Sequence, residues 1–192
     1  MKPSSTLLPL NVLKKIKQKV WDLPVRLLHW GLAATVAAAW LTRNRLGPLH
    51  EYLGYATCAI VSARFVWGFA GNRYARFAQF ARTVKPTWKY LQNVVAAKAP
   101  RYLGHNPLGG WMAIALLSCV AMLSVTGWLY TTDMFWGYGW LARLHAGLGW
   151  LLLIMIALHV AGMLFTSWQH RENLVAAMFS GDKTKPTGDD VA

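Results

Sequence analysis

The chain has 192 residues, of which 55% are hydrophobic and only 14% are charged, and eleven of them are tryptophans. This composition argues against a soluble domain and points to a protein that crosses a membrane several times. The formal net charge of +13 would suit nucleic-acid binding, so the positions of the basic residues have to decide between the two classes.

Residues 1–20 are rich in lysine and predict a solvated, basic tail. Four apolar stretches follow, each long enough for a helix to cross the hydrocarbon core, which takes about 20 residues. They run from Pro24 to Thr42, from Pro48 to Ala70, from Pro107 to Tyr130 and from Trp140 to Trp168. The expected fold is therefore all-α, an integral membrane four-helix bundle formed by residues 21–170.

Two segments outside the predicted spans also carry a pattern. The connection 71–104 contains "PTWKYLQNVVAAK", in which Trp88, Leu91 and Val95 recur at helical spacing. This spacing predicts a short helix that lies at the membrane interface. Residues 171–192 are rich in Gly, Pro, Lys and Asp toward their end, and this composition predicts a disordered tail.

The basic residues gather on one side of the predicted membrane. Sixteen of the twenty Lys and Arg residues lie in the N-terminal region, the 71–104 connection or the C-terminal tail. Three lie in the two connections on the other side, namely Arg43, Arg45 and Arg143. By the positive-inside rule both termini are expected in the cytoplasm, and if the host is a Gram-negative bacterium, the bundle spans the inner membrane with its other side in the periplasm. Membrane lipid, and not nucleic acid, is then the expected partner of the positive charge.

Four of the six histidines lie in or at the ends of the predicted spans, where an unpaired polar side chain is costly. Fourteen residues separate His145 from His159, and a helix of that length rises about 21 Å over almost four turns. The two imidazoles therefore point to the same side at two depths. His50 matches His145 near the periplasmic side, and His29 matches His159 near the cytoplasmic side.

Imidazoles from facing helices of a bundle are typical axial ligands of haem iron. Two stacked pairs predict two haems b, which form an electron path across the bilayer and explain why one helix carries two histidines. A porphyrin between helices also needs small neighbours. Five glycines lie within four residues of the four histidines, namely Gly31, Gly54, Gly147, Gly149 and Gly162.

Arg64 is the basic residue well inside a predicted span, and it follows His50 by fourteen positions. It should share the face of His50 at the depth of the cytoplasmic-side haem, where its guanidinium would pair with a propionate. Snorkelling to a lipid phosphate is the alternative. Arg26 and Arg143 are weaker propionate candidates.

Other interpretations of the histidines are less suitable. A hydrogen bond between helices explains one intramembrane histidine better than four that are matched in depth. Zinc or copper would need a carboxylate or thiolate cluster, which the pattern does not offer. His105, in "GHNPLGG", either binds a quinone headgroup or has a structural role at a helix start, and the second is favoured. His170 is expected to be interfacial.

Several motifs resemble the bacterial cytochrome b561 family, which is related to the cytochrome b subunits of nickel–iron hydrogenases and formate dehydrogenases. They are "VRLLHW", "LHEYLGY", "RFVWGFAG", "GHNPLGGWM" and "LHAGLGW" with "ALHVAGML", spread over residues 20–170. The resemblance implies a four-helix bundle with two b-type haems. His29 and His159 would hold the cytoplasmic-side haem, and His50 and His145 the periplasmic-side haem.

Three functions follow as hypotheses. The first is a respiratory-chain cytochrome that moves electrons between the quinone pool (ubiquinone or menaquinone) and a periplasmic partner. That partner would be a cytochrome c or a dehydrogenase or hydrogenase subunit. The second is an enzyme that passes electrons from superoxide or another small donor to quinone, with Arg43, Arg45 and Arg143 at its entrance. The third, a non-redox transporter or scaffold, leaves the matched histidines unexplained.

Overall fold

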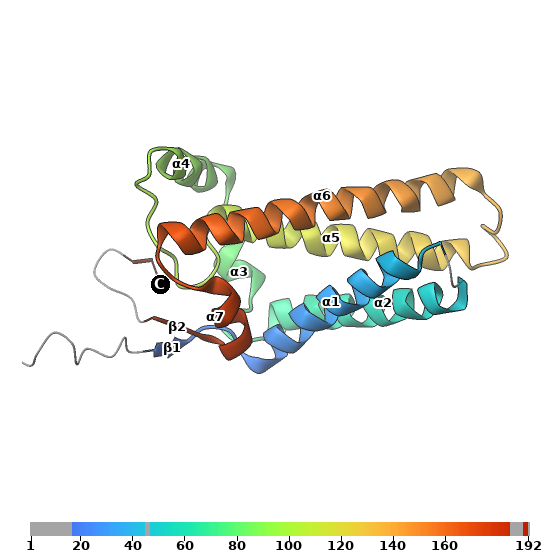
Figure 1. Ribbon diagram of the computed structural model, residues 1–192, viewed down its shortest axis with the longest axis horizontal. Coiled ribbons are helices and arrows are strands. Elements are labelled where there is room, and N and C mark those ends of the chain that lie inside the picture. The colour runs from blue at the N-terminus through green and yellow to red at the C-terminus, as the bar shows by residue number, and fades with distance from the viewer. Residues whose placement is uncertain (1–16, 45–46, 185–189, 192) are drawn as a thin grey trace, which may run out of the picture.

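The computed structural model describes residues 17–44, 47–184 and 190–191. The elements in chain order are β1 (Lys17–Lys19), α1 (Leu23–Thr42), α2 (Gly47–Ala70), α3 (Phe77–Phe80), α4 (Val84–Val95), α5 (Pro107–Tyr130), α6 (Gly139–Gln169), α7 (Leu174–Ser180) and β2 (Asp182–Thr184). The four long helices α1, α2, α5 and α6 run along the long axis of the molecule, and the short elements gather at one end of them (Figure 1). The chain is therefore mostly helical, as predicted. Most of the predicted basic tail, residues 1–20, lies outside the described residues.

Within the described residues, three helices are long and apolar enough to cross a membrane: Pro48–Ala70, Pro107–Tyr130 and Gly139–Gln169. These are three of the four predicted spans. The fourth, α1, has 20 residues but does not reach the same hydropathy, because its first two turns contain Pro24, Arg26 and His29. The fourth span therefore stays a prediction.

The helix starts follow from local capping. Asp22 precedes α1, and its Oδ1 accepts a hydrogen bond from the backbone N–H of Val25 at 2.9 Å. Asn106 precedes α5, and its Oδ1 accepts from the N–H of Gly109 at 2.7 Å. A proline stands in the first turn of each helix, where its missing N–H costs no helical hydrogen bond.

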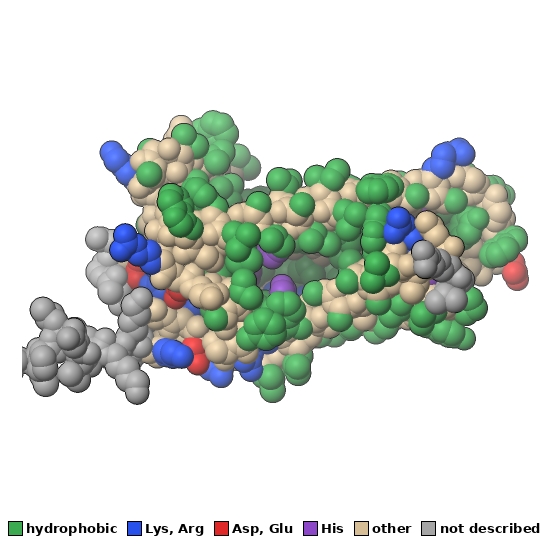
Figure 2. All heavy atoms as spheres, viewed as in Figure 1, with side chains coloured by type: hydrophobic (Ala, Val, Ile, Leu, Met, Phe, Trp, Pro, Cys, Tyr) green, Lys and Arg blue, Asp and Glu red, His purple; other side chains and the backbone are tan. Residues whose placement is uncertain are grey.

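The long helices pack as neighbours in chain order. α1 packs along α2, α2 along α5, and α5 along α6, whereas α6 makes few close backbone contacts with α1 or α2. A buried cluster that includes Val61, Leu117, Val120 and Leu152 fills the junction of α2, α5 and α6. Between α6 and the first two helices the surface is hollowed, and histidine side chains are visible in the hollow (Figure 2).

The outer surface of the bundle is apolar. Trp150, Ile154, Leu158 and Leu164 of α6 are between 56% and 60% exposed, although they lie in the middle of a long helix. Such a surface would be an aggregation hazard in water but matches the hydrocarbon of a bilayer. The exposure pattern therefore agrees with the membrane location indicated by hydropathy.

The prediction of a disordered tail from residue 171 is wrong for residues 171–184, which form α7 and β2. β2 pairs antiparallel with β1, with Lys17 opposite Thr184. Gly181 ends α7 with a φ of 85°, and its carbonyl oxygen accepts hydrogen bonds from the N–H groups of Val20 at 2.9 Å and Trp21 at 3.0 Å. The start and the end of the described chain therefore lie together at one end of the bundle.

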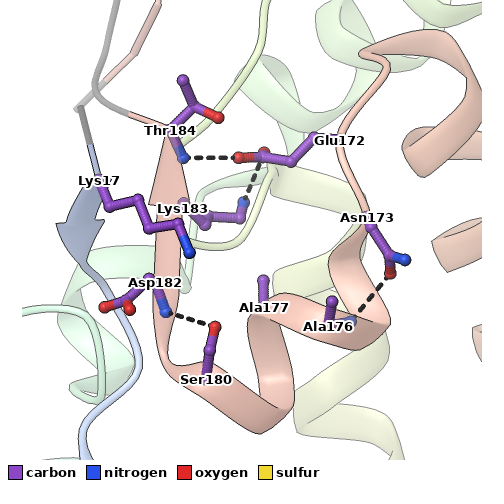
Figure 3. A pocket seen from close by; sticks show the side chains of 9 residues that line it. All are labelled: Lys17, Glu172, Asn173, Ala176, Ala177, Ser180, Asp182, Lys183 and Thr184. Atoms are coloured by element: carbon purple, nitrogen blue, oxygen red, sulfur yellow. Dashed lines mark hydrogen bonds and ion pairs between the residues drawn. The ribbon is translucent and has the colours of Figure 1, made fainter. Parts of the chain in front are cut away.

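An ionic cluster orders this end. Arg101 Nη2 lies 2.8 Å from Glu172 Oε1, and Arg101 Nη1 lies 2.6 Å from Asp190 Oδ2. Lys183 Nζ lies 3.7 Å from Glu172 Oε2, and Figure 3 shows the two side chains pointing toward each other. We call these four residues the C-terminal clasp. Two of its three pairs join Arg101 to residues far along the chain, so the local composition that predicted disorder could not reveal them.

Candidate functional site

His50 and His145 face each other across the bundle. His50 lies in the first turn of α2 and His145 in the second turn of α6, with ring centroids 6.2 Å apart and ring planes 87° apart. A metal ion bound to both rings at the usual metal–nitrogen distance of about 2 Å would hold the ring centres roughly 6 Å apart. The spacing of this outer pair therefore suits two axial ligands of one iron.

Both rings of the outer pair are held through Nδ1. His50 Nδ1 lies 2.9 Å from the carbonyl oxygen of Ala39, which can only accept, so this nitrogen carries the proton. His145 Nδ1 lies 3.0 Å from Thr126 Oγ1, whose own proton is donated to the Met122 carbonyl at 2.8 Å. In each ring Nε2 is then unprotonated, and its lone pair is free for iron.

Thr126 and Gly127 support the outer pair and were missed by the sequence analysis. A methyl group on Gly127 would lie 3.1 Å from Cε1 of His145, so the glycine leaves the space that the ring occupies. Thr126 is buried and accepts the hydrogen bond of the same ring. The signal that could have found them is the pair of a polar and a small residue inside an otherwise apolar span.

The inner pair, His29 of α1 and His159 of α6, is arranged differently. The two imidazoles are close enough for the charge of one to act on the other, but no ring contact joins them within the described residues. His29 packs edge-on against Trp30 at 5.0 Å, and Trp30 stacks on Phe179 of α7 at 4.2 Å. His29 Nδ1 is buried and has no hydrogen-bond partner among the described residues.

Arg64 is buried in α2, with 7% of its surface exposed. Its Nη2 donates to the Ala75 carbonyl at 3.3 Å, and its guanidinium lies 5.5 Å from the ring of Phe77. Nη1 has no hydrogen-bond partner in the part of the chain that the structure describes. Burial disfavours snorkelling, and a buried cation this poorly paired is costly unless an anionic ligand completes its surroundings.

The two weaker candidates for a propionate partner lie elsewhere. Nη1 of Arg26 donates to the carbonyl of Phe179, so this side chain ties α1 to α7. Arg143 is exposed near the start of α6. Of the other predicted cations at that end, Arg43 stacks on Trp40 at 3.8 Å, and Arg45 lies outside the described residues.

Two of the five predicted glycines share a face with a candidate ligand. Gly54 lies one turn after His50, and a methyl group added there meets no atom within 4 Å. Gly149 lies one turn after His145, and its methyl group would be 3.5 Å from the ring of Trp40. The other three are placed differently: Gly31 faces Ile60 of α2, and Gly147 and Gly162 are exposed. Gly54 therefore leaves open space on the histidine face.

His105 has a structural setting. Its ring packs edge-on against Trp21 at 4.9 Å and lies 4.5 Å from the ring of Phe80. Burial, with the positive charge of Arg64 as a smaller cause, lowers the pKa of His105 to about 3, so the ring is neutral. The cap of α5 is the neighbouring Asn106. His170 follows α6 beside the C-terminal clasp, where burial lowers its pKa.

The hollow on the histidine face is separate from a polar cavity beside α7. That cavity is lined by residues of β1, α7, β2 and their flanks, and by none of the histidines (Figure 3). Among the described residues, no three His, Cys, Asp or Glu side chains gather where they could hold a bare metal ion. The facing imidazoles, the open face at Gly54 and the Nη1 of Arg64, which has no hydrogen-bond partner among the described residues, instead fit a haem.

Comparison with known proteins gives a consistent result. The family described as prokaryotic cytochrome b561 matches residues 20–181. The chain is 28% identical to proteins of Azotobacter chroococcum mcd 1 and Azotobacter vinelandii, each named "Probable Ni/Fe-hydrogenase B-type cytochrome subunit", over 89% of this chain and 90% of the relative. A protein of the same name from Bradyrhizobium diazoefficiens is 23% identical over 85% of each chain. No solved structure matches the chain.

Proposed function

Because the chain belongs to the prokaryotic cytochrome b561 family, we propose that it is a di-haem cytochrome that carries electrons across the membrane between the quinone pool and a periplasmic redox partner. Membership of the family establishes that the chain is a membrane b-type cytochrome of electron transport and that it uses haem b. The number of haems, their ligands, the quinone and the direction of transfer belong to the proposal.

The observation that carries the proposal is the geometry of the outer pair. His50 and His145 approach from two helices with centroids 6.2 Å apart, and each ring is oriented by a hydrogen bond at Nδ1 that leaves Nε2 free. Nδ1 of each ring already bonds to a neighbouring helix, and a histidine pair that served only as a contact between helices would be expected to use Nε2 in such a bond as well. The free Nε2 atoms support axial ligation of the outer haem.

The inner pair would hold the second haem. His29 lies in the second turn of α1 and His159 in the second half of α6, so both lie toward the end of the bundle where the short elements gather (Figure 1). Arg64 would neutralise a propionate of this haem. Once bound, haem b supplies the reversible one-electron chemistry of its iron. The surrounding residues hold the ligands in place and keep water away from them.

The topology is part of the same proposal. α1 lies along α2, so it is proposed as the fourth span despite its lower hydropathy. The end that carries β1, β2 and α7 is proposed to face the cytoplasm of a bacterial inner membrane, because the lysine and arginine residues concentrate there. The outer pair then lies near the periplasm.

The periplasmic partner is proposed to be a hydrogenase, since relatives over most of the chain are named as hydrogenase cytochrome subunits. The connection between α5 and α6 offers a docking surface at the outer end. It exposes large apolar side chains, with Met134 at 76% and Trp136 at 71%. Exposed aromatic residues are enriched at protein interfaces.

A spectroscopic experiment tests the proposal. The full chain is purified in mild detergent, and haem per polypeptide and reduced-minus-oxidised spectra are measured. Two low-spin b haems are expected. His50→Ala or His145→Ala should leave only the inner haem, and His29→Ala or His159→Ala only the outer one. His170→Asn, which removes a histidine outside the pairs, should retain both. A single haem in the wild-type chain, or two in any of the four ligand variants, would contradict the proposal.

A further inference from the structure

A groove between α4 and α5 is not used by the proposed electron path. Val84, Thr87, Trp88 and Leu91 of α4 form one wall of the groove, and Leu108 and Trp111 of α5 form the other. Its volume is about 360 Å³ and its walls are almost wholly apolar. The hydroxyl group of Thr87 is satisfied by the carbonyl oxygen of Thr83 at 3.0 Å. We call this feature the α4–α5 groove.

The groove lies where a membrane-crossing helix begins. Leu108 and Trp111 belong to the first two turns of α5, and Trp111 Nε1 donates to the backbone carbonyl of Arg82 at 3.0 Å. Tryptophans at the ends of spanning helices lie at the headgroup level of a bilayer. In Figure 2 the hydrophobic side chains of α4 gather on the side of this helix that is turned toward the long helices. The groove therefore opens toward the region where acyl chains begin.

Three cations lie near the groove residues along the chain. Arg82 precedes α4, Lys85 follows Val84 and Lys89 follows Trp88, and all three are exposed. No ion pair joins any of them to a described residue. The whole connection 71–104 contains no Asp or Glu, and Arg101, which the C-terminal clasp pairs, lies far along the chain from these three cations. This edge attracts an anion that lies at the membrane surface.

The chemistry of the groove selects among possible occupants. A quinone headgroup needs hydrogen-bond donors for its carbonyl oxygens, but the surface of the groove is almost wholly apolar, and the Thr87 hydroxyl and the Trp111 indole N–H are already used. A second copy of the chain would bring a similarly basic connection against Arg82, Lys85 and Lys89, which repels it. An amphipathic lipid with a negative headgroup matches both the apolar wall and the basic edge.

We propose that the α4–α5 groove binds an anionic phospholipid of the adjacent leaflet. One acyl chain lies against Trp88, Leu91 and Leu108, and the phosphate lies among Arg82, Lys85 and Lys89. The inference extends beyond the proposed function, because it depends on the membrane location of α5 and not on the haems. Haem content therefore reports separately on the proposed function.

The test uses the haem-loaded full chain in detergent and native mass spectrometry. Phosphatidylglycerol and phosphatidylcholine with identical acyl chains compete for the protein. The wild-type chain is expected to retain one phosphatidylglycerol in preference. The variant with Arg82→Gln, Lys85→Gln and Lys89→Gln should lose this preference by about tenfold or more, because each charge near the surface contributes separately. Leu91→Trp, which fills the groove, should weaken the binding of both lipids.

A matched control removes three cations elsewhere at the same end. Lys17→Gln, Lys19→Gln and Lys98→Gln are exposed positions outside the groove, so this variant should keep the preference. An equal loss in the control would show a general effect of charge and overturn the site. Equal retention of the two lipids by the wild-type chain, or unchanged preference after removal of the groove cations, would overturn it as well. Visible spectra of each variant confirm that the bundle is folded.

Discussion

Thr126 Oγ1 lies 3.0 Å from His145 Nδ1, and the same hydroxyl group lies 2.8 Å from the carbonyl oxygen of Met122. The hydroxyl proton is committed to the helix backbone, so its oxygen accepts from the imidazole. Such an acceptor gives the ring more anionic character and makes Nε2 a better donor to oxidised iron. Thr126 is thus a positioning residue for the outer pair.

Replacing Thr126 with valine keeps the size of the side chain but removes the acceptor. The outer haem should lose roughly tenfold in affinity, and its midpoint potential should rise by tens of millivolts, on the order of the change per tenfold for one electron. Redox titration with haem quantification measures both. Thr126→Ser retains the hydroxyl and should behave like the wild-type chain. A valine variant with an unchanged outer potential would argue against the ligand assignment of His145.

Gly127→Ala tests the steric support of the same ring. The new methyl group would lie 3.1 Å from His145 Cε1, so the ring must move by a few tenths of an ångström. Alanine stabilises a helix by about 1 kcal/mol relative to glycine, and this gain offsets the cost of moving the ring. The thermal stability should therefore change little. Electron paramagnetic resonance should show an altered outer haem and an unaltered inner one. In Gly147→Ala the methyl group meets no atom within 4 Å, and both signals should stay the same.

Arg64→Met should lower the potential of the inner haem. A buried cation near a haem favours the reduced iron, and its loss is expected to shift the potential down by on the order of 50–100 mV. The apoprotein should not be less stable, because the replaced cation has one hydrogen bond and an unpartnered Nη1 among the described residues. Arg143→Met removes an exposed cation that solvent screens, so it should leave both potentials in place. An unchanged inner potential in Arg64→Met would place the propionates elsewhere.

Glu172→Gln should open the C-terminal clasp. Glu172 accepts from Arg101 Nη2 at 2.8 Å and from the N–H of Thr184 at 3.0 Å, and loss of its charge should cost about 2 kcal/mol of local stability. Faster hydrogen exchange of the Val20 and Trp21 amides, which bond to Gly181, would report the opening. Asp182→Asn is the control, since the Asp182 carboxylate joins no ion pair among the described residues.

The clasp should also weaken in acid. Burial alone would raise the pKa of Glu172, but the hydrogen bonds from Arg101 and Thr184 and the charges of Lys183 and Arg101 outweigh it, so the pKa lies below its ordinary value of 4.5. A carboxylate with a lowered pKa stabilises the fold above its unfolded-state pKa, and this contribution disappears as the pH falls through the folded-state pKa. Exchange protection of the Trp21 amide should therefore fall below about pH 4.5. The Glu172→Gln variant should show no such step.

Hydropathy predicted the long helices closely. The predicted stretch from Pro107 to Tyr130 coincides with α5. The spans predicted for α1 and α2 differ by one residue at the start, and the span predicted for α6 differs by one residue at each end. The helix expected within residues 86–98 is found as α4, Val84–Val95, and its location at the membrane interface stays a prediction. These elements are encoded by composition and periodicity within one segment, and for that reason a single sequence suffices to locate them.

The features that sequence analysis missed depend on contacts between distant segments. α7 and β2 are ordered by Arg101 and by pairing with β1, and neither partner is visible in the local composition. Spacing along α6 gave the two depths of His145 and His159, but the orientation of the rings depends on Thr126 of α5 and Ala39 of α1. Closeness in sequence also assigned too many glycines to the face of the histidines. Gly147, for example, lies two residues after His145 and so faces the opposite side of α6.

The two hydrogen bonds from Val20 and Trp21 to the Gly181 carbonyl have a consequence for biosynthesis. The partners are at least 160 residues apart, so they cannot meet until the ribosome has made the chain as far as Gly181. The long helices can enter the bilayer and pack one after another during translation, because each contacts its neighbour in sequence. The end that carries β1 and β2 closes last. Until then α1 is not tied to the C-terminal segment, and the hollow between α1 and α6 is free to widen for cofactor loading.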